Sequence, residues 1–281
     1  MQTFSDISSI RQQVSAWQST NEAVALVPTM GHLHEGHVSL FNIAKSHASK
    51  VIVSIFVNPL QFNQPDDFEH YPRTLNSDLE ILKNLPVDAV FMPHDNEIYP
   101  NGTDKAPLIQ IPELSDRFCG QFRPGHFDGV CTVVTKLFNI VSPNYAVFGE
   151  KDYQQLLIIR RLVEEFNFNI NIIAGETLRE DSGLAMSSRN SHLSREENEI
   201  APMFYSVLSE TKNNFANHNT EQLERTAAQQ LEQAGMKVEY FSIRDAENLQ
   251  FISKSTKKVV ILSAIWLGDT RLIDNVLFPL P

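Results

Sequence analysis

Residues 28–37 (PTMGHLHEGH) carry three histidines, and two of them, His34 and His37, have a spacing that suits chemistry on an anion. They follow an apolar run and precede a helical pattern, so they lie where a strand gives way to a helix. The first turn of a helix presents N–H groups that favour phosphate, and Gly31 and Gly36 permit tight turns beside it. His34 and His37 are one helical turn apart and can point the same way. The segment is a candidate phosphate site.

Other interpretations of this segment compete with phosphate binding. The glycine spacing of a P-loop is present, but His37 and Val38 stand where Lys and Ser or Thr are required, so we reject a P-loop. The histidines could form half of a metal site, although HExxH spacing is absent and no clear third ligand follows. A functionless pair of surface histidines fits HxxH alone. The preceding PTMG and the position after a strand argue against that interpretation.

Residues 57–62 (VNPLQF) follow a second apolar run. In an open parallel sheet the carboxyl ends of the strands line the ligand crevice, so Asn58 and Gln61 are expected near the first motif. Amide groups there can recognise hydroxyls or a carboxylate. Taken alone, the segment fits an ordinary polar loop better.

Two more segments carry candidate phosphate ligands. Residues 148–155 (FGEKDYQQ) again join a strand to a helix; Lys151 could hold phosphate and Asp152 could hold ribose hydroxyls, unless these acidic residues only cap the helix. Residues 186–189 (MSSR) offer two hydroxyls and a guanidinium, which suit a triphosphate, unless they are a linker that caps the next helix.

These segments need a scaffold, and the apolar pattern predicts one. Short apolar runs bounded by breakers are typical of strands buried in a parallel sheet, and helical patterns lie between them. We therefore expect an α/β fold with a Rossmann-like, doubly wound parallel sheet. The expected strands are residues 23–27, 51–57, 89–92, 145–148 and 170–174.

The last hundred residues have a different pattern. Ser194 to Glu197 has the form of a capping box before an apolar stripe, and a second helix is expected at residues 221–234. Strand patterns follow at residues 238–244, 259–265 and 272–277. We expect a smaller C-terminal α+β domain. The expected domain boundaries are 1–178 and 179–281.

Composition limits the function classes. The chain has 281 residues, 42% hydrophobic and 20% charged, with a net charge of −11. An acidic chain repels nucleic-acid phosphates, and no apolar stretch is long enough to span a membrane. The first residues lack a signal-peptide pattern, and two cysteines do not make a disulfide framework, so we expect a cytoplasmic protein without membrane or nucleic-acid partners.

Together the motifs resemble the pantothenate synthetases (pantoate–β-alanine ligases), which belong to the wider HxGH nucleotidyltransferase group. The resemblance covers nearly the whole chain. The matching segments are residues 28–37 (PTMGHLHEGH), 57–62 (VNPLQF), 71–73 (YPR), 123–127 (RPGHF), 148–152 (FGEKD), 187–190 (SSRN) and 266–275 (WLGDTRLIDN).

The resemblance implies ATP-dependent condensation of pantoate with β-alanine through a pantoyl-adenylate, with release of AMP and pyrophosphate. It implies Mg²⁺ carried on ATP, with Asp78 as a less certain helper, no organic prosthetic group, and a homodimer. The implied catalytic residues are His37 as proton donor, His34, Arg189 and Lys151. The implied ligands of pantoate and β-alanine are Gln61, Gln155 and Asn58. The implied ATP-binding residues are Met30, Gly31, His32, Leu33, His34, Glu35, Gly36, His37, Gly149, Glu150, Lys151, Asp152, Leu178, Met186, Ser187, Ser188 and Arg189.

Two positions depart from the family pattern. His32 stands where a small or amide residue is usual, and Asp128 where a basic residue is common, which puts fine substrate affinity in doubt.

Two other functions stay open. An adenylyl or cytidylyl transferase could share the HxGH motif, but Gln61 and Gln155 favour pantoate as the substrate. A nucleotide-binding regulator without chemistry would need neither these glutamines nor MSSR.

Overall fold

The computed structural model describes residues 1–63 and 65–280, which divide into two units. The first unit comprises Met1–Glu150 and Gln154–Glu176. The second comprises Lys151–Tyr153 and the chain from Thr177 onward. The short segment Lys151–Tyr153 thus belongs to a unit whose other residues come later in the chain.

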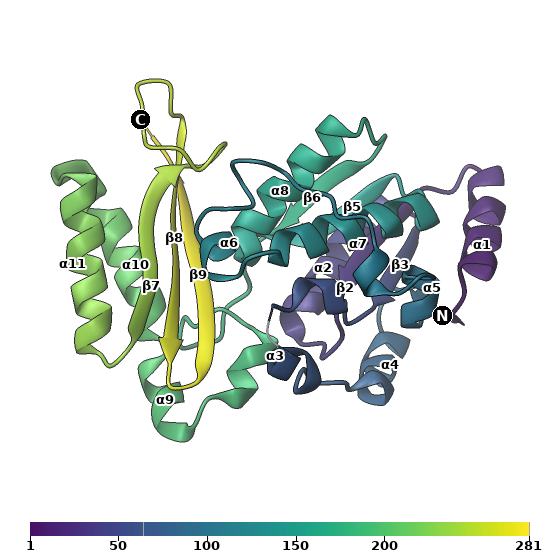
Figure 1. Cartoon of the computed structure of the whole chain (residues 1–281), viewed down its shortest axis with the longest axis horizontal. Helices are drawn as coiled ribbons and strands as arrows, with labels where there is room; N and C mark the ends of the chain where they lie inside the picture. The colour runs from purple at the N-terminus through teal and green to yellow at the C-terminus, as the bar shows by residue number, and fades with distance from the viewer. Residues whose placement is uncertain (64, 281) are drawn as a thin grey trace. The chain divides into compact units, whose positions relative to one another are not determined.

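The first unit is built on a six-stranded sheet in which every paired strand is parallel (Figure 1). Its strands are β1 (Gln2–Phe4), β2 (Val24–Thr29), β3 (Lys50–Ile55), β4 (Ala89–Phe91), β5 (Tyr145–Gly149) and β6 (Asn171–Gly175). Their order is β1-β4-β3-β2-β5-β6. Valine, isoleucine and alanine fill the central strands on both faces, so these strands are buried almost completely.

Helices lie between these strands along the chain. They are α1 (Ile7–Ser19), α2 (Glu35–His47), α3 (Pro65–Glu69), α4 (Leu75–Lys83), α5 (Asp95–Ile98), α6 (Cys119–Phe122), α7 (His126–Val141) and α8 (Tyr153–Glu165), with 3-10 turns η1 (Pro59–Gln61), η2 (Thr103–Lys105) and η3 (Glu150–Asp152). Helix α2 packs Phe41 and Ala44 against Val27 and Val53 of the sheet. The predicted α/β doubly wound fold is confirmed.

The strand order reverses between β2 and β5. From β2 the chain proceeds to β3 on one side, and later returns to place β5 on the other side. Ligands of open α/β sheets bind outside the carboxyl ends of the strands at such a switch point. The motifs at residues 28–37 and 148–152 follow these two strands, so the topology places them at the expected ligand edge.

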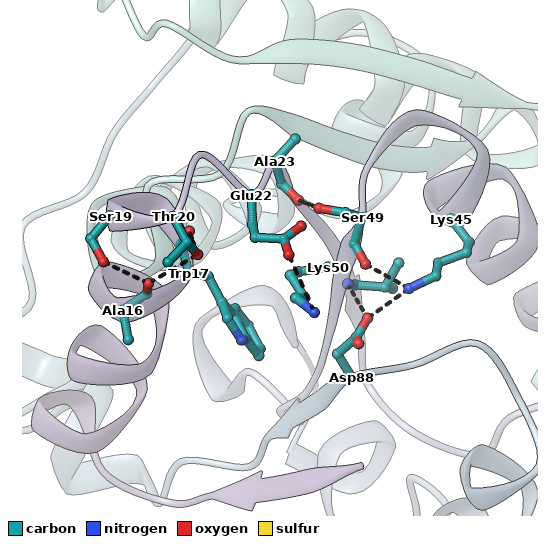
Figure 2. Close-up of polar contacts among 11 residues, drawn as sticks. Ala16, Trp17, Ser19, Thr20, Glu22, Ala23, Lys45, Ser49, Lys50 and Asp88 are labelled. Atoms are coloured by element: carbon teal, nitrogen blue, oxygen red, sulfur yellow. Dashed lines mark hydrogen bonds and ion pairs between the residues drawn. The ribbon is translucent and has the colours of Figure 1, made fainter.

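Polar contacts at the opposite, amino-terminal edge fix the ends of β2 and β3 (Figure 2). Asp88 accepts hydrogen bonds from the Val51 N–H and from Lys45 Nζ, which also donates to the Ser49 carbonyl. Lys50 lies 3.8 Å from Glu22 in an ion pair. This edge supports the sheet and lies away from the candidate motifs.

The second unit is an antiparallel sheet with helices. Its elements are η4 (Ser188–His192), α9 (Arg195–Ile200), α10 (Met203–Asn214), η5 (Phe215–Asn217), α11 (Thr220–Gln233), β7 (Lys237–Asp245), β8 (Lys258–Leu267) and β9 (Thr270–Pro279). Phe204, Leu208 and Leu231 of the helices share one core with Ile261 and Ile265 of β8. The predicted C-terminal α+β character is confirmed. Across residues 1–63 and 65–280, no helix has the length and apolar character needed to cross a membrane.

Candidate functional site

The loop after β2 turns through two consecutive left-handed residues, Gly31 (φ 79°) and His32 (φ 51°). This conformation directs the next N–H groups toward one buried carboxylate. The His32 and Leu33 N–H groups donate to Asp78 Oδ2 (3.0 Å) and Oδ1 (2.8 Å). The Thr74 hydroxyl also donates to Oδ2, at 3.2 Å. Successive N–H groups of this kind form an anion-binding concavity, and here the anion is a side chain of the protein itself.

His34 and His37 cap helix α2 reciprocally. His34 is the N-cap residue, and its Nδ1 accepts from the Gly36 N–H at 3.1 Å. The His34 N–H donates in turn to His37 Nδ1 at 3.3 Å, and the ring centroids are 4.2 Å apart. Each Nδ1 therefore acts as an acceptor, which places the proton of the neutral ring on Nε2. Both rings are fixed as Nε2–H donors.

The same cap uses much of the hydrogen-bonding capacity of the first helical turn. The His37 and Val38 N–H groups bond to the His34 carbonyl at 2.8 and 3.2 Å, and the Gly36 N–H bonds to the His34 ring. The expectation of backbone N–H groups open to phosphate thus fits this turn poorly. The imidazole Nε2–H groups are better suited to meet an anion here.

Gln61 and Asn58 belong to one buried network after β3. Asn58 is 1% exposed; its amide nitrogen donates to Gln61 Oε1 (3.0 Å) and to the Gly129 carbonyl (3.1 Å). The Tyr99 hydroxyl donates to Asn58 Oδ1 at 2.6 Å. Gln61 Nε2 points at Met30 Sδ, 3.1 Å away. Asn58 is thus engaged by the protein, and Gln61 is held against the loop after β2.

The backbone of Gln61 is fixed from helix α7. His126 Nδ1 donates to the Gln61 carbonyl at 2.8 Å, because a carbonyl can only accept. Arg123 contacts His126 Nε2 at 3.2 Å. Gly129 leaves no room for a Cβ, which would meet the Leu60 carbonyl group and the Gln61 nitrogen. The RPGHF motif therefore positions Gln61.

The two adjacent glutamines of helix α8 have different environments. Gln154 is 4% exposed and bonds to the Cys119 N–H and to the Leu114 and Arg117 carbonyls, so its role is structural. Gln155 is partly exposed at the start of the same helix. Gly149 and Glu150, which directly precede Lys151, belong to the first unit at the end of β5.

The remaining predicted ATP ligands lie in the second unit, which holds Lys151, Asp152 and Leu178. The Met186 N–H donates to the Leu178 carbonyl at 3.0 Å and closes a small hairpin. Beyond it, the Ser187 hydroxyl accepts from the Arg189 N–H at 3.2 Å and caps η4, which begins at Ser188. The predicted site residues are therefore divided between the two units.

A resident metal ion does not fit these residues. Both oxygens of Asp78 accept hydrogen bonds from the protein, and the residue is 1% exposed. Within the described part of the chain, no three His, Cys, Asp or Glu side chains gather to hold a metal. Thiol chemistry is also disfavoured, because burial first and Asp128 second raise the pKa of Cys131 to about 12.

Comparison with known proteins identifies the family of this chain. The family model described as pantoate–β-alanine ligase matches residues 2–277. The chain belongs to this family.

Relatives and solved structures extend the family match over both units. Pantothenate synthetases of Buchnera aphidicola subsp. Acyrthosiphon pisum (strain Tuc7) and Shewanella loihica are 45% and 47% identical, over 98% and 99% of both chains. The crystal structure of pantothenate synthetase from Thermus thermophilus superposes with a TM-score of 0.91 at 37% identity, covering 98% of this chain and 99% of the other. The Francisella tularensis pantoate–β-alanine ligase, solved with β-γ ATP and β-alanine, gives 0.82 at 39% identity, covering 99% and 97%.

Some supporting residues of this family member have no signal in the motifs alone. Tyr99 and Gly129 bond to Asn58 from 41 and 71 positions away in sequence. The motif at residues 123–127 indicated importance, but its purpose emerges only from the hydrogen bond between His126 and Gln61.

Proposed function

We propose that this chain activates pantoate with ATP and then joins the acyl group to β-alanine. The observation that carries the proposal is the reciprocal histidine cap after β2, at the switch point of the sheet. Gln61 contacts Met30, at the start of the same loop. The cap supplies two fixed donors for an anion, and the Gln61 amide suits a hydroxy acid. Membership of the pantoate–β-alanine ligase family gives the reaction class.

In the first step a pantoate carboxylate oxygen attacks the α-phosphorus of ATP, and pyrophosphate leaves. Both reactants are anions, so the principal tasks are charge neutralisation and alignment. We assign the loop from Met30 to His37 to ATP, with the Nε2–H of His37 as the donor to the phosphates. His34 assists it and holds its ring through the shared cap.

Gln61 and Gln155 are assigned to pantoate. The buried network around Asn58 supports an indirect role for Asn58, because its amide already bonds to Gln61, Gly129 and Tyr99. Asn58 would orient the Gln61 amide and leave the contact with substrate to Gln61.

The second unit would supply positive charge. We assign Lys151 and Arg189 to the phosphates, with Met186, Ser187 and Ser188 closing over them, and Gly149, Glu150, Asp152 and Leu178 to the nucleotide. In functional terms, residues 1–178 bind nucleotide and pantoate, and residues 179–281 act as a lid.

Mg²⁺ enters this scheme as part of the substrate, bound to the triphosphate. The hydrogen bonds of Asp78 support a different role from the metal helper suggested by resemblance. We assign Asp78 to holding the loop after β2 and route no step through the ion.

In the second step the neutral amine of β-alanine attacks the acyl carbon, AMP leaves, and the amine loses a proton. An alkylamine has a pKa of roughly 10, so only about one molecule in a thousand is neutral at pH 7. The site must favour the neutral amine and must keep water from the mixed anhydride.

A homodimer is also proposed, and light scattering at several protein concentrations tests it.

Pantoate-dependent exchange of labelled pyrophosphate into ATP, without β-alanine, tests the reaction. We expect exchange that requires both pantoate and Mg²⁺. Other small hydroxy acids serve as controls, and equal exchange with them would point to another member of the HxGH group. No exchange without β-alanine, while full turnover with β-alanine still yields AMP, would overturn the separate adenylate intermediate. No AMP under either condition would overturn the proposed function.

A further inference from the structure

The motif at residues 266–275 has no part in the chemistry proposed above, yet its last two residues are nearly inaccessible. Asp274 and Asn275 lie on β9 and are 3% and 4% exposed. A polar side chain at such a position must find partners within the protein. Both side chains reach partners outside the sheet to which β9 belongs.

Asp274 binds the hairpin that precedes the MSSR segment. Its two carboxylate oxygens accept from the guanidinium of Arg179 at 2.7 and 2.9 Å, in a bidentate pair. The same guanidinium donates to the Gly183 carbonyl at 3.1 Å and lies 3.6 Å from the ring centroid of Tyr205. Paired, planar geometry of this kind fixes direction as well as distance. The hairpin is thereby attached to β9.

Asn275 binds the other cationic segment. Its amide nitrogen donates to the Lys151 carbonyl at 2.9 Å. Tyr153, two residues later, donates its hydroxyl to the Ala246 carbonyl at 2.7 Å. These bonds explain why Lys151–Tyr153 belongs to the second unit although its sequence neighbours belong to the first.

We propose that Asp274 and Asn275 are positioning residues for ATP activation. Adjacent on one strand, they hold the hairpin that leads to Arg189 and the backbone of Lys151, so both cationic segments keep a fixed geometry within the second unit. Neither residue needs to touch ATP. This inference rests on the proposed function, because it assumes that Lys151 and Arg189 act on the phosphates.

The second unit contains a matched control. Glu239 on β7 accepts from Arg271 of β9 at 2.7 and 3.0 Å, and from Trp266 at 2.6 Å. This pair is also well buried, with side chains 12% and 9% exposed. Its hydrogen bonds join strands of the sheet, so E239Q weakens the same fold without releasing the hairpin or the Lys151 segment.

The experiment compares D274N, N275D and E239Q in pantoate-dependent pyrophosphate exchange at varied ATP. We expect D274N and N275D to lower kcat/KM for ATP by about ten- to a hundredfold, since a misplacement of about 1 Å can cost that much. The KM for β-alanine in full turnover should change by less than about twofold, as it should in E239Q. Thermal unfolding of all three gives their loss of stability.

Equal kinetic effects in D274N, N275D and E239Q at a similar loss of stability would overturn the inference. If D274N does not fold, R179K and N275D are compared with E239Q instead. R179K keeps the positive charge but loses the bidentate geometry, so it tests the same contact. Calorimetric binding of a non-hydrolysable ATP analogue to the same variants provides a readout independent of turnover. A wild-type protein without exchange or AMP would overturn the proposed function alone, while the order of analogue affinities would still decide the positioning claim.

Discussion

The loop at residues 30–37 and the segment at residues 178–190 are each held by a buried aspartate, Asp78 in the first unit and Asp274 in the second. Asp78 accepts from two backbone N–H groups and a hydroxyl within the same sheet edge. Asp274 accepts from the guanidinium of Arg179, which is 95 positions away in sequence. The first carboxylate is satisfied by neutral dipoles alone, and the second by a full positive charge together with the Asn275 N–H.

The difference lies in what each carboxylate fixes. Backbone donors set the dihedral angles of a few residues, and here they stabilise the left-handed conformation of His32, which costs about 1–2 kcal/mol in an L-residue. The guanidinium at the end of the long Arg179 side chain forms two bonds to Asp274 and so sets the position of a whole hairpin on β9. Loss of Asp78 should therefore alter shape locally, and loss of Asp274 should alter the placement of a segment that keeps its own shape.

The largest expected effect is at His37, where the first loop is assigned its chemistry. His37→Ala should slow adenylation by about 10²- to 10⁴-fold, the usual range for a positioned proton donor. Single-turnover formation of pyrophosphate, or exchange of pyrophosphate into ATP, measures the loss. A change below about threefold would remove His37 from the mechanism.

Two conservative variants separate capping from chemistry at this position. His37→Asn keeps an acceptor near Nδ1 and should preserve the cap with the His34 N–H, but it lacks a donor at Nε2. His37→Gln keeps a donor near the position of Nε2 but has no acceptor near the position of Nδ1. We expect Asn to retain stability with poor adenylation, and Gln to show better adenylation with a weaker fold. The reverse order would mean that the ring acts only as a cap.

Arg189 tests the second segment. Its replacement by alanine should raise the KM for ATP by roughly 10- to 100-fold, because hydrogen bonds to charged groups contribute about 1.5–3 kcal/mol. Arg195→Ala is the matched control, since that side chain is 90% exposed and pairs with Glu199 on a helix. An unchanged ATP dependence in R189A would contradict the assignment of this segment to the phosphates.

Asp78→Asn probes the local carboxylate. The amide turns one donor toward an N–H of His32 or Leu33, so we expect a loss of about 1–3 kcal/mol in unfolding free energy and about tenfold in adenylation. Asp88→Asn at the opposite edge of the sheet is the control. Asp88 also accepts from a backbone N–H, and in addition from Lys45, but its replacement should leave adenylation unchanged. Equal kinetic losses in both variants would mean that Asp78 acts only on stability.

The smallest expected effect is at Tyr99. Tyr99→Phe removes the donor to buried Asn58 Oδ1 and should lower unfolding free energy by about 1–3 kcal/mol, with a several-fold rise in the KM for pantoate. Burial first, and Asp95 second, raise the pKa of Tyr99 above its ordinary 10.0. The hydroxyl therefore contributes fully below about pH 10 and loses its contribution only above that value. A difference between wild type and Y99F that already shrinks between pH 6 and 9 would contradict this.

The sequence predicts the sheet well because its signal is local. Runs such as residues 51–57 are apolar on both faces, which only a covered parallel strand accommodates. Strand β1 (Gln2–Phe4) was not predicted, since three residues with two polar side chains carry no such pattern. The single stripe from Ile200 to Leu208 divides into α9 and α10, where Pro202 lacks the N–H that a continuous helix needs.

The site is predictable only where a motif and its partner are close in sequence. The spacing of His34 and His37 implies a shared direction, and the cap between them confirms it. The support of Asn58 by Tyr99 and of Gln61 by His126 depends on contacts across the fold, which no spacing encodes. Asp78 was noticed through resemblance, but its hydrogen bonds to the loop backbone become visible only in three dimensions.

The assignment of Lys151–Tyr153 to the second unit has a consequence for synthesis on the ribosome. The chain passes between the units after residues 150, 153 and 176. Asn275, which holds the Lys151 carbonyl, lies on β9, and β9 emerges after every other described strand. A nascent chain can therefore complete the parallel sheet of the first unit while Lys151 still lacks its anchor. If Lys151 acts on the phosphates as proposed, nucleotide activation requires that the last strand is already in place.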